Sequence, residues 1–279
     1  MNSIQPVEII KIEKNEQSGY SDLVVTEEPL EIRLGYGSES QRAQFTLSVT
    51  MRTPGNDEEL CLGFLYSEDI ISSIADVISV KYCDDLGSNE GRENVMRVEL
   101  NPALEIDIPS LQRNFYTSSS CGVCGKASIE SVQVHCEIIT TNGLVATKDV
   151  LFTLPEKLRK AQQVFKHTGG LHASGLFNLQ GELLVHKEDV GRHNALDKLL
   201  GNLLLKDITI ARSSILMLSG RISFELVQKA VKARIPIIAA VGSPSSLAVD
   251  LANEFGVTLI GFLKENKFNI YTNEERILS

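Results

Sequence analysis

The sequence predicts an α/β protein in which a smaller, β-rich α+β domain precedes a larger domain of alternating strands and helices. In the first 115 residues, short and partly alternating apolar runs are separated by turn residues, which is typical of strands. From residue 116 onward, strand-like apolar runs alternate with stretches of helical spacing. That alternation indicates parallel strands with helices on both faces of a sheet. We therefore expect two domains, 1–115 and 116–279.

The first domain is expected to contain several strands and one helix. The strands are predicted at 7–12, 23–26, 30–34, 44–49, 78–82 and 95–100. The helix is predicted to begin at Asn56 or Asp57, because such side chains cap exposed amides and the acidic residues that follow suit a positive helix start. Leu60, Phe64 and Leu65 give this helix a face that can pack against the core.

The second domain is expected to begin its regular alternation with a hairpin. The predicted order is strands 176–179 and 183–186, helix 191–204, strand 214–218, helix 224–233, strand 235–241, helix 247–255 and strand 257–262. Ligands of such sheets gather at the carboxyl ends of the strands. The loops Ser219–Arg221, Gly242–Ser246 and Leu263–Lys267 follow predicted strands and are therefore candidates for ligand binding.

Composition narrows the class of protein. The chain has 279 residues, 43% of them hydrophobic, and a net charge of −9. The first domain carries a net charge of −12 and the second a net charge of +3, so the second suits an anionic ligand and general nucleic-acid binding is disfavoured.

No apolar run approaches the roughly 20 residues that cross a bilayer. The start resembles no signal peptide, and five cysteines do not suggest a secreted disulfide framework, so we expect a reducing cytoplasm.

The sharpest local motif is a pair of cysteines, Cys121 and Cys124, among small residues between Thr117 and Lys126. Small neighbours let a bulky partner approach the sulfur atoms, and a following helix start with Lys126 would lower a thiol pKa. Four interpretations remain open for the pair: half of a zinc site, a redox dithiol, a sulfur carrier or no chemistry. A second ligand pair for zinc is missing from the sequence, so we expect no bound metal.

Three further clusters combine glycine with polar side chains. The segment 167–175 contains His167 and His172 beside two glycines, which indicates a pocket lined by backbone rather than a core strand, although a structural role for the histidines stays open. The segment 188–198 precedes a helix, where Arg192 can clamp an anion or the polar residues can form a cap with salt bridges. The third, Ser219–Ser223, is a strand-to-helix turn that suits phosphate, although it lacks a nucleotide-binding motif.

Taken together, these clusters resemble the FdhD/NarQ family, the formate dehydrogenase accessory sulfurtransferases. The resemblance covers nearly the whole chain and depends on the joint order of five segments: 119–126, 167–175, 188–197, 219–223 and 242–247. The cysteine pair of the family maps onto Cys121 and Cys124. The resemblance implies a second domain with the three-layer α/β/α fold of the cytidine deaminases, and a homodimer.

The resemblance also implies a function. Such proteins take sulfur from a cysteine desulfurase as a cysteine persulfide and pass it to the molybdenum (or tungsten) bis-molybdopterin guanine dinucleotide cofactor, which is then inserted into formate dehydrogenase. On this view Cys121 carries the persulfide, and Cys124 resolves it or relays the sulfur. The cofactor is a bound substrate. The residues expected to contact it are Ile260, Gly261, Phe262, Leu263, Lys264 and Glu265, with Ser219, Gly220 and Arg221 as further contacts.

Two other functions compete with sulfur transfer. Zinc deaminases use an H-x-E segment followed by P-C-x-x-C. This chain has His172-Ala173-Ser174, which lacks the glutamate, and its C-x-x-C comes before that segment, so deamination is disfavoured. A chaperone that holds the cofactor without chemistry would have no need of the cysteine pair, yet the sequence leaves it open.

Overall fold

The computed structural model describes residues 3–14, 16–83, 92–109, 111, 136–140 and 143–278. The predicted domain boundary and the cysteine pair lie outside these residues. The first part contains the strands β1 (Ile4–Glu13), β2 (Glu16–Val25), β3 (Glu28–Tyr36), β4 (Ala43–Arg52), β5 (Val77–Tyr82) and β6 (Val95–Leu100), and the helix α1 (Asp57–Ser67). Each strand predicted in the first domain is confirmed, with bounds that differ by a few residues.

The second part is built on a six-stranded sheet with the order β13-β12-β11-β10-β8-β9. The strands are β8 (His172–Asn178), β9 (Leu183–Asp189), β10 (Ser214–Leu218), β11 (Ile237–Ala240), β12 (Thr258–Lys264) and β13 (Lys267–Thr272). The three central strands β10, β11 and β12 run parallel, while β8 is antiparallel to β10 and β13 is antiparallel to β12. β13 was not predicted, because the chain reverses directly after β12 in a tight hairpin instead of entering a loop. The prediction that 167–175 is not a core strand is wrong for its second half, because residues 172–175 begin β8 and pair with its neighbours.

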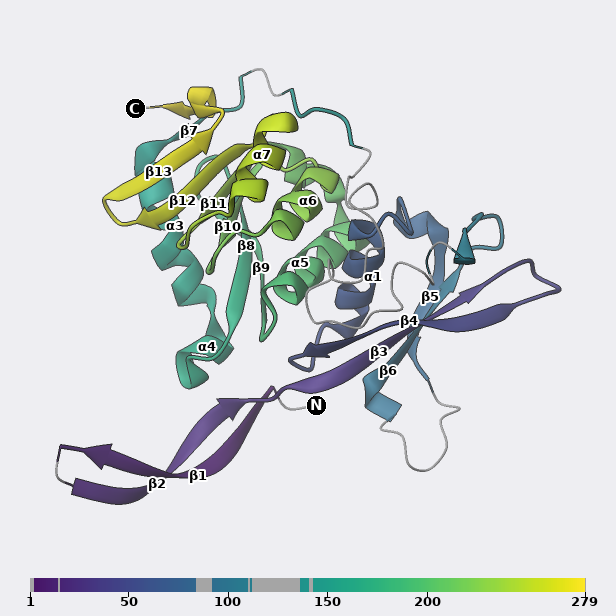
Figure 1. Cartoon of the computed structure of the whole chain (residues 1–279), viewed down its shortest axis with the longest axis horizontal. Helices are drawn as coiled ribbons and strands as arrows, with labels where there is room; N and C mark the ends of the chain where they lie inside the picture. The colour runs from purple at the N-terminus through teal and green to yellow at the C-terminus, as the bar shows by residue number, and fades with distance from the viewer. Residues whose placement is uncertain are drawn as a thin grey trace.

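Helices cover both faces of this sheet, which confirms the predicted three-layer α/β/α fold class (Figure 1). α3 (Lys148–Ala161) packs on one face, where Leu151, Leu154 and Leu158 join Phe177 and Met217 in one apolar cluster. α5 (Arg192–Lys206), α6 (Phe224–Lys232) and α7 (Ser246–Glu254) cover the other face. The short helix α4 (Gln163–Thr168) follows α3, and the strand pair β7 (Ala146–Thr147) and β14 (Ile277–Leu278) closes the end of the chain. α3 and α4 were not predicted.

The first part forms its own sheet, with the order β4-β3-β6-β5. Leu30, Ile32 and Leu34 of β3 are buried beneath α1. α1 begins where predicted, but the predicted side-chain cap is wrong: Asn56 has a left-handed backbone (φ 58°) and makes no side-chain cap bond. β1 and β2 pair with each other as a long hairpin that projects from the body of the molecule (Figure 1).

The two parts meet where α1 packs against α5. A methyl group on Gly63 would lie 1.8 Å from the backbone oxygen of Asp197, and one on Gly201 would lie 1.8 Å from the backbone oxygen of Glu59. The two helix backbones are therefore in direct contact, which only glycine permits at these points. The apolar cluster beneath them is continuous and includes buried residues of β3, α1, α5, α6 and α7.

We predict that Gly201→Ala destabilises the protein. Alanine normally stabilises a helix interior by about 1 kcal/mol relative to glycine. Here its methyl group would force α1 away from α5, and overpacking of this kind costs about 1–3 kcal/mol or more. Chemical denaturation of both proteins measures the difference. Gly19→Ala is the control, because nothing lies within 4 Å of a methyl group there. A Gly201→Ala protein as stable as the wild type would contradict this account of the interface.

Candidate functional site

One edge of the six-stranded sheet brings together most of the predicted clusters. β9, β10, β11 and β12 all end at this edge, and β8 begins there, because His172 is paired with Asp189 across the antiparallel ladder. The loops that leave these strands therefore lie side by side, as the carboxyl ends of parallel strands require. The segments 167–175, 188–198, 219–223 and 242–247, which are far apart in the sequence, meet at this edge.

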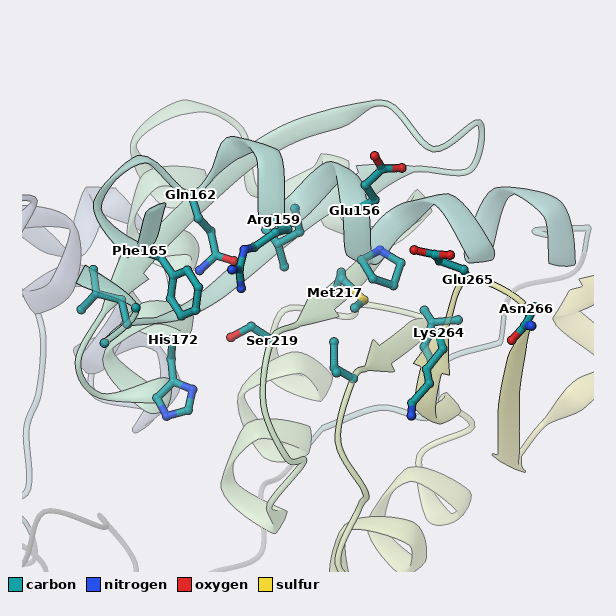
Figure 2. A pocket seen from close by; sticks show the side chains of 17 residues that line it. Glu156, Arg159, Gln162, Phe165, His172, Met217, Ser219, Lys264, Glu265 and Asn266 are labelled. Carbon is teal, nitrogen blue, oxygen red and sulfur yellow. The ribbon is translucent and has the colours of Figure 1, made fainter. Parts of the chain in front are cut away.

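A cavity of about 860 Å³ opens at this edge, between α3, α4 and the sheet (Figure 2). It is lined by Pro155, Glu156, Leu158, Arg159, Gln162, Phe165, Gly169, Gly170, Leu171, His172, Met217, Ser219, Val241, Leu263, Lys264, Glu265 and Asn266. Figure 2 shows Arg159, Gln162, Phe165 and His172 toward one end, and Lys264, Glu265 and Asn266 toward the other. The volume suits a ligand of nucleotide size or a part of a larger one.

Two cations face this cavity without a carboxylate partner in the described part of the chain. Arg159 packs over the ring of Phe165, with its guanidinium carbon 4.1 Å from the ring centroid, and has no carboxylate within 4.0 Å among those residues. Lys264, at the end of β12, likewise has none. A guanidinium and an ammonium group that no described carboxylate neutralises can bind phosphate groups.

The predicted cofactor residues fall into two groups. Ser219, Leu263, Lys264 and Glu265 line the cavity. Ile260 is fully buried in the core, and Gly261 lies tightly against Pro244, so neither reaches the cavity lining.

Three further predicted cofactor residues lie outside that lining and pack at the same sheet edge: Phe262, Gly220 and Arg221. Phe262 has a left-handed backbone (φ 53°), and its amide donates to the backbone oxygen of Gly242 at 3.0 Å. Gly220 lies beside the ring of His172, and Arg221 contributes positive charge near that ring.

Ser219 fixes the junction of β8 and β10 at the cavity. Its hydroxyl oxygen accepts a hydrogen bond from the Ala173 amide at 2.8 Å, and its own amide donates to the Ala173 carbonyl at 3.0 Å. Gly242 allows the neighbouring loop to approach, since a methyl group there would lie 2.8 Å from the Gly220 carbonyl oxygen. The loops at this edge are therefore packed against one another and hold their shape before any ligand binds.

His172 is half-buried at the same edge. Burial lowers the pKa of its imidazole, and the neighbouring Arg192, His193 and Arg221 lower it further, while Asp189 acts in the opposite direction. The ring is therefore neutral at pH 7. A neutral ring can both donate and accept a hydrogen bond at the cavity wall.

The cluster 188–198 is largely a structural network, which supports the cap and salt-bridge interpretation for most of it. Lys198 is buried and lies 2.7 Å from Asp189 and 2.7 Å from the Thr53 carbonyl oxygen. Asp189 also accepts hydrogen bonds from the amides of Thr53 (3.1 Å) and Gly191 (2.8 Å). Through Thr53 this network joins the first part of the chain to the sheet edge. Removing one partner of the buried ion pair would leave an uncompensated charge and would destabilise that junction.

The remaining members of this cluster are held in pairs. Asp197 binds Lys229 at 2.8 Å, and His193 lies 3.1 Å from the Ser223 hydroxyl. Arg192 stands at the sheet edge near His172, and its Nε atom is buried without a hydrogen-bond partner among the residues described. The structure thus leaves only Arg192 as a candidate anion ligand in this cluster.

The five cysteines differ in their surroundings. Cys83 is partly exposed and directly follows β5. Cys121 and Cys124 lie outside the described residues. Burial raises the pKa of the Cys61 thiol, which packs in the core, and it also raises the pKa of the half-buried Cys136. Both thiols stay protonated at neutral pH and are poor nucleophiles. Within the described ranges, no three His, Cys, Asp or Glu side chains gather as a metal site would require.

Arg159, Gln162 and Phe165 are the cavity residues that sequence reasoning missed. Arg159 lies on α3, Gln162 joins α3 to α4 and Phe165 lies on α4, in a stretch without glycine or histidine clusters. The available signal was the helical spacing of Leu151, Leu154 and Leu158 immediately before the His167 cluster. That spacing predicts a helix but does not indicate which polar residues face a cavity.

Comparison with known proteins decides the family. The model of the FdhD/NarQ family matches residues 25–278. The chain belongs to the FdhD/NarQ family. It is 48% identical over 275 residues to the sulfur carrier protein FdhD of Sulfurisphaera tokodaii, covering 99% of each chain. It is 47% identical to the protein of the same name from Streptomyces coelicolor, covering 96% of this chain and 94% of the other.

The fold has a solved counterpart. The crystal structure of a formate dehydrogenase accessory protein from Desulfotalea psychrophila superposes with a TM-score of 0.74 at 23% identity, covering 99% of this chain and 100% of the other. At that identity the likeness concerns the fold. Among the described residues, no helix is both long enough and apolar enough to span a bilayer.

We predict that His172 titrates below the ordinary histidine value of 6.5. The unfolded chain then binds more protons than the folded chain as the pH falls below that value, so stability decreases as the pH falls through the pKa of the folded state. Arg192→Gln should raise the pKa of His172, because it removes a repulsive charge. Proton NMR titration of the imidazole measures both values. Arg234→Gln, which removes a distant guanidinium that pairs with Glu137, should leave the pKa unchanged. A His172 pKa at or above 6.5 would contradict the described surroundings.

Proposed function

We propose that this protein is a sulfur carrier that serves formate dehydrogenase. It accepts sulfur from a cysteine desulfurase as a persulfide on Cys121 and transfers it to the molybdenum (or tungsten) bis-molybdopterin guanine dinucleotide cofactor before that cofactor enters the enzyme. Family membership and the names of the relatives support the carrier role. The observation that carries the cofactor assignment is the cavity of about 860 Å³ with its two cations, Arg159 and Lys264, which have no carboxylate partner among the described residues.

The loading step needs no oxidant. The Cys121 thiolate attacks the outer sulfur of the donor persulfide, the sulfur–sulfur bond of the donor breaks, and the donor thiolate leaves. A persulfide then stands on Cys121. The raised pKa values of Cys61 and Cys136 keep those thiols from competing for the sulfur.

Delivery requires two electrons, because the outer sulfur of a persulfide becomes sulfide. Cys124 can supply them together with Cys121: its thiolate attacks the inner sulfur, sulfide leaves toward the cofactor, and a disulfide joins the two cysteines until a cellular dithiol reduces it. Alternatively, Cys124 receives the outer sulfur and relays it onward as its own persulfide.

The cavity suits the nucleotide portion of the substrate. Lys264 supplies positive charge for the pyrophosphate, Arg159 adds positive charge at the other end of the cavity, and Ser219 and the neutral His172 supply hydrogen bonds between them. The local charge matters because the whole chain carries −9. The proposal further includes a cytoplasmic homodimer that contacts both the desulfurase and formate dehydrogenase.

We predict that Cys121→Ala abolishes sulfur delivery while the fold is retained, because the acceptor thiolate is lost. Formate dehydrogenase activity in cells that express each variant measures delivery, and the mass of the purified protein after incubation with a desulfurase and cysteine measures loading. Cys136→Ser is the control and should keep both, because burial keeps that thiol protonated. Wild-type formate dehydrogenase activity with Cys121→Ala would contradict the carrier role. GDP binding retained after loss of sulfur transfer separates the carrier from a pure chaperone.

We predict that Lys264→Ala weakens binding of GDP, used as a fragment of the cofactor, by roughly tenfold to a hundredfold. A charge-assisted contact with phosphate contributes about 1.5–3 kcal/mol, and each 1.4 kcal/mol corresponds to tenfold in affinity. Calorimetry measures the change. Lys148→Ala is the matched control, since Lys148 begins α3 on the exposed surface and does not line the cavity. Equal GDP affinity for Lys264→Ala and the wild type would place the phosphate site elsewhere.

A further inference from the structure

An unsatisfied buried amide faces the cavity. Gln162 is only 4% exposed, lines the cavity, and its side-chain nitrogen has no hydrogen-bond partner among the residues that the structure describes. A buried donor without a partner costs free energy, so native proteins satisfy nearly all of them. An unsatisfied donor at a cavity wall indicates that a ligand supplies the acceptor.

The position of Gln162 is fixed from three directions. It joins α3 to α4: its backbone N–H donates to the Leu158 carbonyl at 3.2 Å, and its backbone carbonyl accepts from the Lys166 N–H at 3.2 Å. Glu188 of β9 then accepts hydrogen bonds from the amides of Val164 (3.2 Å) and Phe165 (3.0 Å), which ties α4 to the sheet. A side chain on a backbone held in this way loses little further freedom when a ligand binds.

The neighbours of Gln162 provide a surface for a planar group. The guanidinium plane of Arg159 packs over the ring of Phe165, and Figure 2 shows both side chains beside the Gln162 amide, facing His172 and Ser219. Guanidinium and aromatic planes stack readily with flat heterocycles. Lys264 lies toward the other end of the cavity, so a flat ring beside Gln162 leaves a charged tail free to reach the ammonium group.

We infer that Gln162 is a specificity-determining residue whose amide pairs with the lactam edge of a fused nitrogen heterocycle, a carbonyl next to a ring N–H. A primary amide presents a donor and an acceptor side by side, which complements that edge. Guanine and pterin both carry it, whereas adenine does not. This assignment rests on the proposed function, because both rings occur in the proposed substrate.

The discriminating power comes from the unsatisfied amide. A site that hydrogen-bonds a substrate group rejects an analogue without it, because the buried polar atoms of the protein then stay unpaired. Adenine would present an amino group and an unprotonated ring nitrogen in reversed order. The amide could meet that order only by rotating by half a turn, which would move its oxygen to the place that the nitrogen occupies in the structure.

The test compares GDP, ADP and neopterin by calorimetry on wild-type protein, Gln162→Leu and Gln162→Glu. Gln162→Leu removes both hydrogen-bonding atoms, and Gln162→Glu keeps the shape but removes the donor, so it remains informative if the leucine variant fails to fold. The matched control is Gln163→Leu, which changes the adjacent, exposed glutamine. We expect both Gln162 variants to weaken a lactam ligand by at least tenfold. Gln162→Leu should leave ADP unchanged, Gln162→Glu should weaken ADP less than GDP because its carboxylate also repels the phosphate groups, and Gln163→Leu should change nothing.

The outcomes separate this inference from the proposed function. Weakened GDP binding with neopterin unaffected assigns the guanine end, and the reverse assigns the pterin end; either supports the role of Gln162. The role of Gln162 is overturned if both variants bind GDP and neopterin as the wild type does, or if they lose ADP binding to the same extent as GDP binding. In either case the cavity remains the cofactor site. No binding of GDP or neopterin to wild-type protein overturns the proposed function and this inference with it.

Discussion

The backbone contact between α1 and α5 is the constraint on which the rest of the molecule depends. Gly63 and Gly201 allow two helices from distant parts of the chain to touch without intervening side chains. The contact joins the small sheet of the first part to the helical layer of the second and makes their apolar cores continuous. α5 also covers the six-stranded sheet, so its contact with α1 fixes the position of α5 on that sheet. The first residues of α5 lie at the sheet edge where the cavity opens.

The buried ion pair of Asp189 and Lys198 fixes the same region in a second way. Asp189 ends β9, Lys198 lies on α5, and both bind Thr53 just after β4. A buried ion pair is weak evidence for stability. It does fix the positions of its members, because moving one of them leaves the other as an uncompensated buried charge. The network therefore specifies how strand, helix and the first part of the chain meet. The polar segment 188–198, which the sequence offered as an anion site, is therefore mostly structural.

An acidic protein can bind a highly anionic ligand because charge acts locally. Salt screens exposed charges beyond about 8–10 Å, so the net charge of the acidic first part has little effect inside the cavity. There, Arg159 is held on Phe165 and Lys264 ends β12, and neither is neutralised by a carboxylate in the described part of the chain. His172 contributes no positive charge because burial and the neighbouring cations keep its imidazole neutral. The polar wall between the cations can therefore recognise uncharged groups of a ligand.

Local patterns were sufficient for much of the architecture. Alternating apolar residues identified each strand of the first part, and the spacing of the leucines in 191–204 identified α5, because side-chain direction follows from backbone period. Lys264 and Ser219 could be proposed as site residues because they follow strands whose ends must share an edge. Gln162, Arg159 and Phe165 could not be proposed as site residues. The sequence of a helix does not distinguish a side chain that faces a cavity from one that faces solvent or the core. Their role depends on α3 lying across the sheet, near residues about 50 to 100 positions later in the chain. The fate of Asp189 and Lys198 was open for the same reason: a charged side chain becomes a ligand or a structural partner according to which distant groups packing brings within hydrogen-bond distance.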